Sequence, residues 1–114
     1  MRRYAVLKEP IDNGGTPIVK IMLYETAQGV YLFAYSRMDA QQCDGDLWYE
    51  SIEEVYDAWN GLVDANGWIA IDDPLPYCQH DAFLPLRVKG RDTGNPQWGT
   101  FELYDNGVWK EYVP

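Results

Sequence analysis

Lysine and arginine are absent from residues 38–86, a stretch of 49 residues that we call the base-free stretch. Eleven carboxylates lie within it: Asp39, Asp44, Asp46, Glu50, Glu53, Glu54, Asp57, Asp64, Asp72, Asp73 and Asp81. The rest of the chain has seven acids and nine bases, so the formal charge of −9 divides into −11 inside the stretch and +2 outside it. Because nucleic-acid phosphates and anionic membranes are bound mainly through lysine and arginine, we expect no direct binding to nucleic acid or membrane.

Long apolar runs and cysteine-rich patterns are also missing. No apolar run approaches the ~18 residues that a membrane-spanning helix requires. Residues 1–8 include bases, but Glu9 and Pro10 follow where a signal peptide has its apolar segment, so we expect no signal peptide. Only two cysteines are present, which is too few for the disulfide framework of a small secreted protein. These absences predict a cytoplasmic protein.

Aromatic residues are abundant: the chain has five tryptophans, nine tyrosines and three phenylalanines, spread along its whole length. Together with a hydrophobic content of 46%, they argue against disorder despite the high charge. A length of 114 residues predicts a single domain, 1–114. A domain of this size buries roughly two thirds of its unfolded surface, so its core requires neither a metal nor a disulfide.

Runs of β-branched and aromatic residues predict strands, and turn-forming residues separate them. The predicted strands are residues 3–8, 18–25 and 30–37 before the helix, then a short strand 68–71, and then 86–91, 100–105 and 108–113. Residues 9–15, 38–47 and 72–85 are predicted as loops, and 48–50 as a short extension before the helix. We therefore expect an α+β fold, with a mostly antiparallel sheet of about five to seven strands, one main helix packed on it and the order β-β-β-α-β-β-β.

The strand at 30–37 is apolar on both faces, because Val30 and Leu32 alternate with Tyr31 and Phe33. Such a strand is expected either in the interior of a sheet with both faces covered or with an exposed aromatic patch on one face.

The last two strands flank an Asn-Gly turn at 106–107, which is the strongest short signal for a two-residue hairpin. This turn places Glu102 opposite Glu111, and like charges directly opposite each other are unfavourable. The bases Arg87, Lys89 and Arg91 alternate onto one face of the preceding strand, so we expect them to offset these two carboxylates.

One helix is predicted over residues 52–65. Ser51 and Glu54 form a capping-box pattern at its start, and an Asn-Gly pair at 66–67 closes it. Its apolar residues recur at helical spacing and predict one face packed on the sheet. Glu53, Asp57 and Asp64 fall on the opposite face as a stripe of carboxylates.

Glu53 suits the positive N-terminal end of the helix, but Asp57 and Asp64 do not, so helix stability does not account for the stripe. Like charges four residues apart destabilise a helix by roughly 0.2–0.5 kcal/mol per pair, and Asp64 near the C-terminus opposes the helix dipole. One interpretation is that the carboxylates only maintain solubility. A second is a docking surface for a basic protein partner, steered by charge, and a third is cation binding.

Our first hypothesis for function is therefore a small, non-enzymatic, acidic binding or regulatory protein that acts through protein–protein interaction. It uses the base-free stretch against a cationic partner, through the helix stripe and the loop 72–85. The predicted partner-binding residues are Glu53, Asp57, Asp64, Asp72, Asp73 and Asp81. No catalytic residue and no cofactor are assigned under this hypothesis.

A second hypothesis is a small metal-binding protein or enzyme centred on Cys43, Cys78, His80 and Asp81. These four side chains supply the number of ligands that a structural zinc site needs, but only if the loops that carry them meet. The Cys-x-His spacing lies outside the usual two to four residues between ligands. The same residues also suggest a cysteine nucleophile with a histidine base, whereas Cys78 is equally explained as a small buried apolar group.

A third hypothesis is an accessory domain that forms a homodimer through its edge strands and exposed aromatic side chains. The aromatic residues are otherwise explained as core packing.

Overall fold

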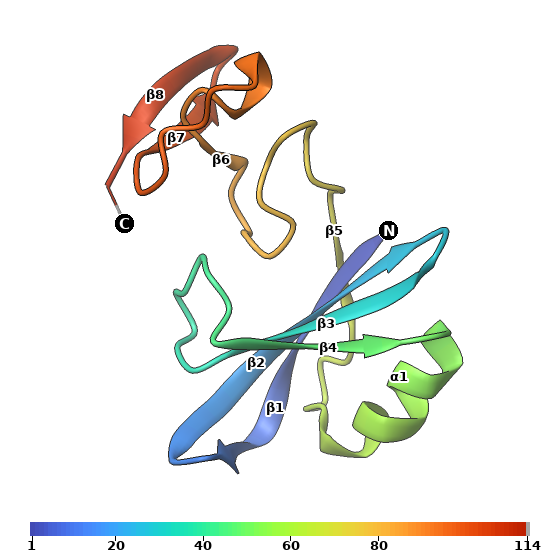
Figure 1. Ribbon diagram of the computed structural model, residues 1–114. Coiled ribbons are helices and arrows are strands. Elements are labelled where there is room, and N and C mark those ends of the chain that lie inside the picture. The colour runs from blue at the N-terminus through green and yellow to red at the C-terminus, as the bar shows by residue number, and fades with distance from the viewer. Residues whose placement is uncertain (114) are drawn as a thin grey trace. The chain divides into compact units, whose positions relative to one another are not determined.

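The computed structural model describes residues 1–113. The chain divides into two compact units, Met1–Asp73 and Pro74–Pro114. The predicted α+β class, with antiparallel strands and one main helix, is confirmed, although the strands belong to two sheets (Figure 1). The single domain expected over 1–114 stays a prediction.

The first unit contains a five-stranded antiparallel sheet (Figure 1). Its strands are β1 (Arg2–Asn13), β2 (Thr16–Thr26), β3 (Gly29–Tyr35), β4 (Gly45–Tyr49) and β5 (Ile69–Ile71). They are arranged in the order β4-β3-β2-β1-β5, so β4 and β5 form the two edges. The apolar strand β3 lies between β2 and β4, as its two apolar faces predict.

The predicted loop at 9–15 is wrong for most of its length, because β1 continues to Asn13. The register shifts between the pair Val6–Lys20 and the pair Ile11–Ile18, where β1 has extra residues that β2 does not match. This irregularity accommodates Pro10, which has no N–H to contribute to the ladder. Strand pairing resumes beyond it up to the turn at Gly14 and Gly15, both of which have positive φ.

The predicted loop at 38–47 ends earlier than expected, because β4 begins at Gly45. A carboxylate oxygen of Asp44 accepts a hydrogen bond from the N–H of Ser36 at 2.6 Å, and the N–H of Asp44 donates to the carbonyl of Ala34 at 2.8 Å. These two bonds close the loop and set the following residues beside β3. The run of strand-forming residues at 45–49 is short, and the extension predicted at 48–50 covers only the last two residues of β4.

The helix α1 (Ile52–Trp59) begins at Ser51, as predicted. The Ser51 hydroxyl accepts a hydrogen bond from the N–H of Glu54 at 3.3 Å. The Glu54 carboxylate accepts one from the N–H of Glu50 at 3.0 Å, one residue before the expected position at the cap. Both bonds satisfy backbone donors near the start of the helix.

The helix ends earlier than the predicted residue 65. A short 3₁₀ turn, η1 (Asn60–Leu62), follows α1, and Val63 is extended, with ψ of 142°. Val63 forms a bridge with Leu7, and the N–H of Asp64 donates to the carbonyl of Val6 at 2.9 Å. Pairing with β1 therefore replaces the last helical turn, and Asp64 lies outside the helix.

The core of the first unit lies between α1 and one face of the sheet. Ala5, Ile21, Leu23 and Leu32 lie on this face and are fully buried, and the helix contributes Val55, which is also fully buried. The opposite face is aromatic: the rings of Tyr24, Tyr31, Phe33 and Trp48 form a contiguous group, with centroid distances of 4.9–6.4 Å.

The second unit contains the antiparallel sheet β6-β7-β8, made of β6 (Leu86–Val88), β7 (Phe101–Asp105) and β8 (Val108–Tyr112). The hairpin predicted at 106–107 is confirmed, since both turn residues have positive φ. The predicted strand 86–91 is shorter than expected because Gly90 adopts φ of 79° and a 3₁₀ turn, η2 (Arg91–Thr93), follows.

The predicted pairing of Glu102 with Glu111 across this hairpin is confirmed. Arg87 offsets the charge of Glu102: its Nε lies 3.2 Å from the Glu102 carboxylate, and its guanidinium lies 3.6 Å from the centre of the Trp109 ring. Within residues 1–113, neither Lys89 nor Arg91 forms an ion pair, so the expected contribution of these two bases is wrong.

Candidate binding surface

The excess negative charge belongs almost entirely to the first unit. Residues 1–73 have thirteen acids and five bases, a formal charge of −8, whereas residues 74–114 have five acids and four bases. A field of one sign over a unit of this size affects which partners approach it and how fast.

Four of the five bases in the first unit donate hydrogen bonds to uncharged oxygens. Arg2 donates to the carbonyl of Asp72, Lys20 to that of Met38 and Lys8 to that of Gly61, while Arg3 donates to the Tyr56 hydroxyl. The fifth base, Arg37, lies 3.5 Å from the carboxylate of Asp39, and both side chains are exposed. The bases of this unit thus connect strands, loops and helix, and none of these contacts involves a carboxylate of α1.

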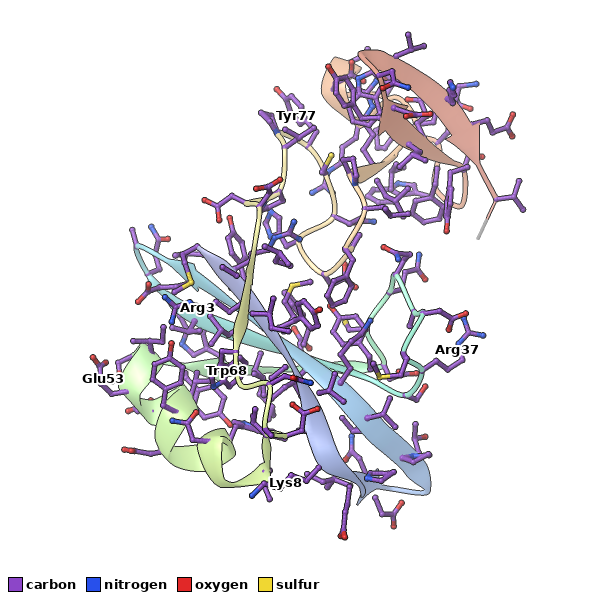
Figure 2. The ribbon with its side chains drawn as sticks, turned by 180° about the vertical axis from the view of Figure 1, so that it is seen from behind. Arg3, Lys8, Arg37, Glu53, Trp68 and Tyr77 are labelled. Carbon is purple, nitrogen blue, oxygen red and sulfur yellow. The ribbon has the colours of Figure 1, made fainter. Side chains whose placement is uncertain are left out.

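The orientation of α1 is fixed by contacts with the sheet. Val55 is buried against it, Arg3 on β1 donates to the Tyr56 hydroxyl at 2.7 Å, and Trp59 donates through Nε1 to the Tyr49 hydroxyl at 3.0 Å. These contacts hold one side of the helix on the sheet. The opposite side, which carries Glu53, faces outward (Figure 2).

Glu53 and Asp57 are the two predicted stripe residues that the helix does present. Both are exposed, and they are four residues apart on α1. Within residues 1–113 neither carboxylate forms an ion pair or a hydrogen bond. Asp64 is different: it is partly buried, and its Oδ1 accepts a hydrogen bond from the N–H of Asn66 at 3.0 Å in the turn after the helix.

The predicted loop residues are divided between the two units. Asp72 and Asp73 are exposed at the end of the first unit, where the Asp73 carboxylate lies 3.0 Å from the amino group of Met1. Asp81 is partly buried and belongs to the second unit.

The candidate metal ligands are divided in the same way. Cys43 belongs to the loop before β4 in the first unit, whereas Cys78, His80 and Asp81 belong to the second. Cys78 is buried and pairs with Arg87 in an isolated bridge, which explains it as an apolar group packed beside β6. Among residues 1–113, no three His, Cys, Asp or Glu side chains are grouped as metal ligands.

No protein-family model, curated protein or solved structure matches the chain. None of the helices formed by residues 1–113 has the length and apolar character needed to cross a membrane. Function is therefore inferred from the residues themselves.

A feature that sequence reasoning missed lies beside β4. A pocket of about 220 Å³ is lined mainly by apolar side chains, including Ile11, Ile18, Leu47 and Trp59, with Asp12 and Asn13 among its polar neighbours. Its walls come from β1, β2, β3, β4 and α1, so its position depends on the strand pairing rather than on any local motif. The only local signal in the sequence was the apolar run at 47–49.

Lys20 is 5% exposed, and burial lowers the pKa of its amino group below the ordinary value of 10.5, while Asp39 acts in the opposite direction. Its Nζ donates to the Met38 carbonyl at 2.7 Å and lies 5.0 Å from the centre of the Tyr35 ring.

We expect the free energy of unfolding to depend on pH through Lys20. Above its lowered pKa, folded Lys20 loses its proton, while the unfolded chain keeps that proton until about 10.5, so stability rises with pH in this window. Urea denaturation at several pH values between about 8 and 11 measures this. The stability of wild type relative to Lys20→Met should increase with pH between the lowered pKa of Lys20 and about 10.5. A stability difference that does not change with pH would contradict a lowered pKa for Lys20.

Proposed function

We propose that this chain is a non-enzymatic binding protein of the cytoplasm, whose first unit binds a cationic protein partner through exposed carboxylates. Glu53 and Asp57 on α1 form the centre of this surface. Asp72 and Asp73 extend it, and Asp64 contributes to the field of this unit as a partly buried charge, whereas Asp81 belongs to the second unit and is left out of this surface.

The observation that carries the proposal is that neither Glu53 nor Asp57 forms an ion pair or a hydrogen bond within residues 1–113. Two like charges four residues apart cost the helix roughly 0.2–0.5 kcal/mol, and no side chain offsets that cost. Arg3 contacts α1, but its hydrogen bond goes to the neutral Tyr56 hydroxyl. A partner that supplies lysine or arginine could form ion pairs with both carboxylates.

A charged surface of this kind changes the association rate of a partner more than it changes the final affinity. Exposed charges steer a partner of opposite sign, and the effect weakens with salt because the Debye length falls from about 10 Å at 0.1 M to about 3 Å at 1 M. Association with the partner is therefore expected to be salt-sensitive.

The test is affinity capture from the native cell lysate, at about 50 mM and about 500 mM salt. Wild type is compared with the double variant Glu53→Gln/Asp57→Asn. The matched control is Glu9→Gln/Glu111→Gln, which removes the same net charge from two exposed acids elsewhere. The proposal predicts that wild type and control capture the same basic proteins at low salt and that the α1 variant loses them.

Recovery of the same proteins by the α1 variant, in the same amounts, would rule out this function for Glu53 and Asp57. Asp64 is left unchanged in the variant because its carboxylate accepts the Asn66 N–H, so its replacement would mix charge with turn stability.

A further inference from the structure

The strand β4 is an edge of the five-stranded sheet, with β3 on one side and no strand of residues 1–113 on the other. Alternate N–H and C=O groups of an edge strand point away from its neighbour and can pair with an added strand. Five residues, Gly45–Tyr49, form this edge, which is enough to pair with a short extended segment.

Each face of β4 presents one exposed apolar side chain. Leu47 lies opposite Leu32, on the face that α1 covers, and keeps 52% of its surface exposed. Trp48 lies opposite Tyr31, on the aromatic face, and keeps 48% exposed. Natural edge strands are usually protected by charged side chains, proline or a covering segment, whereas β4 has no lysine, arginine or proline and its one charged side chain is Asp46.

A pocket adjoins this edge. Leu47 is one of its walls, together with Ile11, Ile18 and Trp59. Its volume of about 220 Å³ is below the range of about 300–1,000 Å³ that is typical of small-molecule sites. The pocket has the size for one apolar side chain rather than for a metabolite.

The charge around β4 is of one sign. Residues 44–54 have five acids and no base. Asp44 and Glu54 accept backbone hydrogen bonds, whereas Asp46, Glu50 and Glu53 have exposed carboxylates with no partner within residues 1–113. A second copy of this chain would bring the same negative charges to the edge, so charge disfavours pairing between two β4 strands and favours a basic segment.

We propose that β4 binds an extended segment of a basic protein by strand addition. The segment pairs its main chain with β4, places one apolar side chain in the pocket beside Leu47 and directs lysine or arginine toward Asp46, Glu50 and Glu53. This inference rests on the proposed function and specifies the form of the partner: an extended basic strand with alternate apolar residues.

A defined peptide tests this inference without knowledge of the natural partner. The probe is the amidated heptapeptide Arg-Val-Arg-Leu-Arg-Val-Arg with a fluorescent label on its N-terminus, whose binding is measured by fluorescence anisotropy. Two controls have the same length: one has alternate backbone nitrogens methylated, and the other has glutamate in place of arginine. Methylation removes backbone donors without changing charge, so we expect it to weaken binding at least about tenfold, and the acidic peptide should not bind.

The site of binding is mapped on the wild-type protein by backbone amide NMR and hydrogen exchange. Strand addition predicts shifts and added protection at Gly45–Tyr49. The variant Leu47→Lys should weaken binding at least about tenfold, because it places a cation at the pocket. The variant Leu62→Lys is the matched control, since it adds the same charge at another exposed leucine and should leave binding within about twofold.

The outcomes separate the inference from the function on which it rests. Salt-sensitive binding that maps to α1, with equal affinity for both N-methylated and unmethylated probes, would overturn strand addition and leave the acidic binding surface in place. Absence of salt-sensitive binding by the basic probe would overturn strand addition. The proposed function would fail separately if the α1 variant retained its captured partners.

Discussion

Replacing Gly29 with alanine should lower the free energy of unfolding by roughly 2–4 kcal/mol, one of the two largest losses expected in the chain. Gly29 has φ of 152°, a conformation that residues with a side chain rarely adopt. An added Cβ would lie 2.8 Å from the carbonyl oxygen of Tyr49 and would overlap the ring of Trp48. Because both neighbours belong to β4, the clash would also displace the edge strand.

The matched control is Gly61→Ala, because a Cβ at Gly61 meets no atom within 4 Å and its φ is not in the left-handed region. Its stability should be unchanged or raised by up to about 1 kcal/mol. Urea denaturation followed by circular dichroism measures both variants. Equal stabilities of Gly29→Ala and Gly61→Ala would show that Trp48 does not pack over Gly29 as described.

Replacing Leu23 with alanine should lower the free energy of unfolding by about 2–5 kcal/mol. Leu23 is fully buried, pairs with Leu32 on β3 and belongs to the cluster that includes Val55 of α1. Truncation removes apolar contacts and leaves a cavity beneath the helix, which the close-packed neighbours fill only in part.

Leu47→Ala is the corresponding control, since Leu47 keeps 52% of its surface exposed. Its expected change is within about 0.5 kcal/mol. Urea denaturation of both variants compares a buried and an exposed leucine on two strands of the same sheet. A small loss for Leu23→Ala, equal to that of Leu47→Ala, would contradict the position of the core on this face of the sheet.

The sequence predicted most strongly those elements that local chemistry determines. The Ser51 cap, the Asn-Gly hairpin at 106–107 and the interior position of β3 each depend on a few neighbouring residues, and all three are confirmed. Capping, positive φ and alternation act over a few residues, so they can be detected without knowledge of the fold.

The elements that were missed depend on contacts between distant segments. The continuation of β1 beyond Pro10 requires pairing with β2, and the early end of the helix requires Val63 to pair with Leu7. The start of β4 at Gly45 likewise follows the closure of a loop by Asp44. Tertiary pairing overrides local preference in each case, and no residue pattern nearby signals it.

Only part of the candidate surface could be predicted, because the rest depends on contacts between distant segments. Glu53 and Asp57 depend only on helical spacing, and the helix presents both. Asp64 required the helix to continue, and it instead stabilises a turn. The pocket beside Leu47 is assembled from five elements, so it could not be inferred from any one of them.

The central claim is that the carboxylates of α1 bind a cationic partner. Its most direct measurement is the dissociation constant of a captured partner, at salt concentrations from about 50 to about 500 mM, for wild type and for Glu53→Gln/Asp57→Asn. We predict that the variant binds about tenfold more weakly at low salt, that its affinity changes less with salt and that the two proteins converge at high salt. Equal dissociation constants for the two proteins at every salt concentration would contradict the claim.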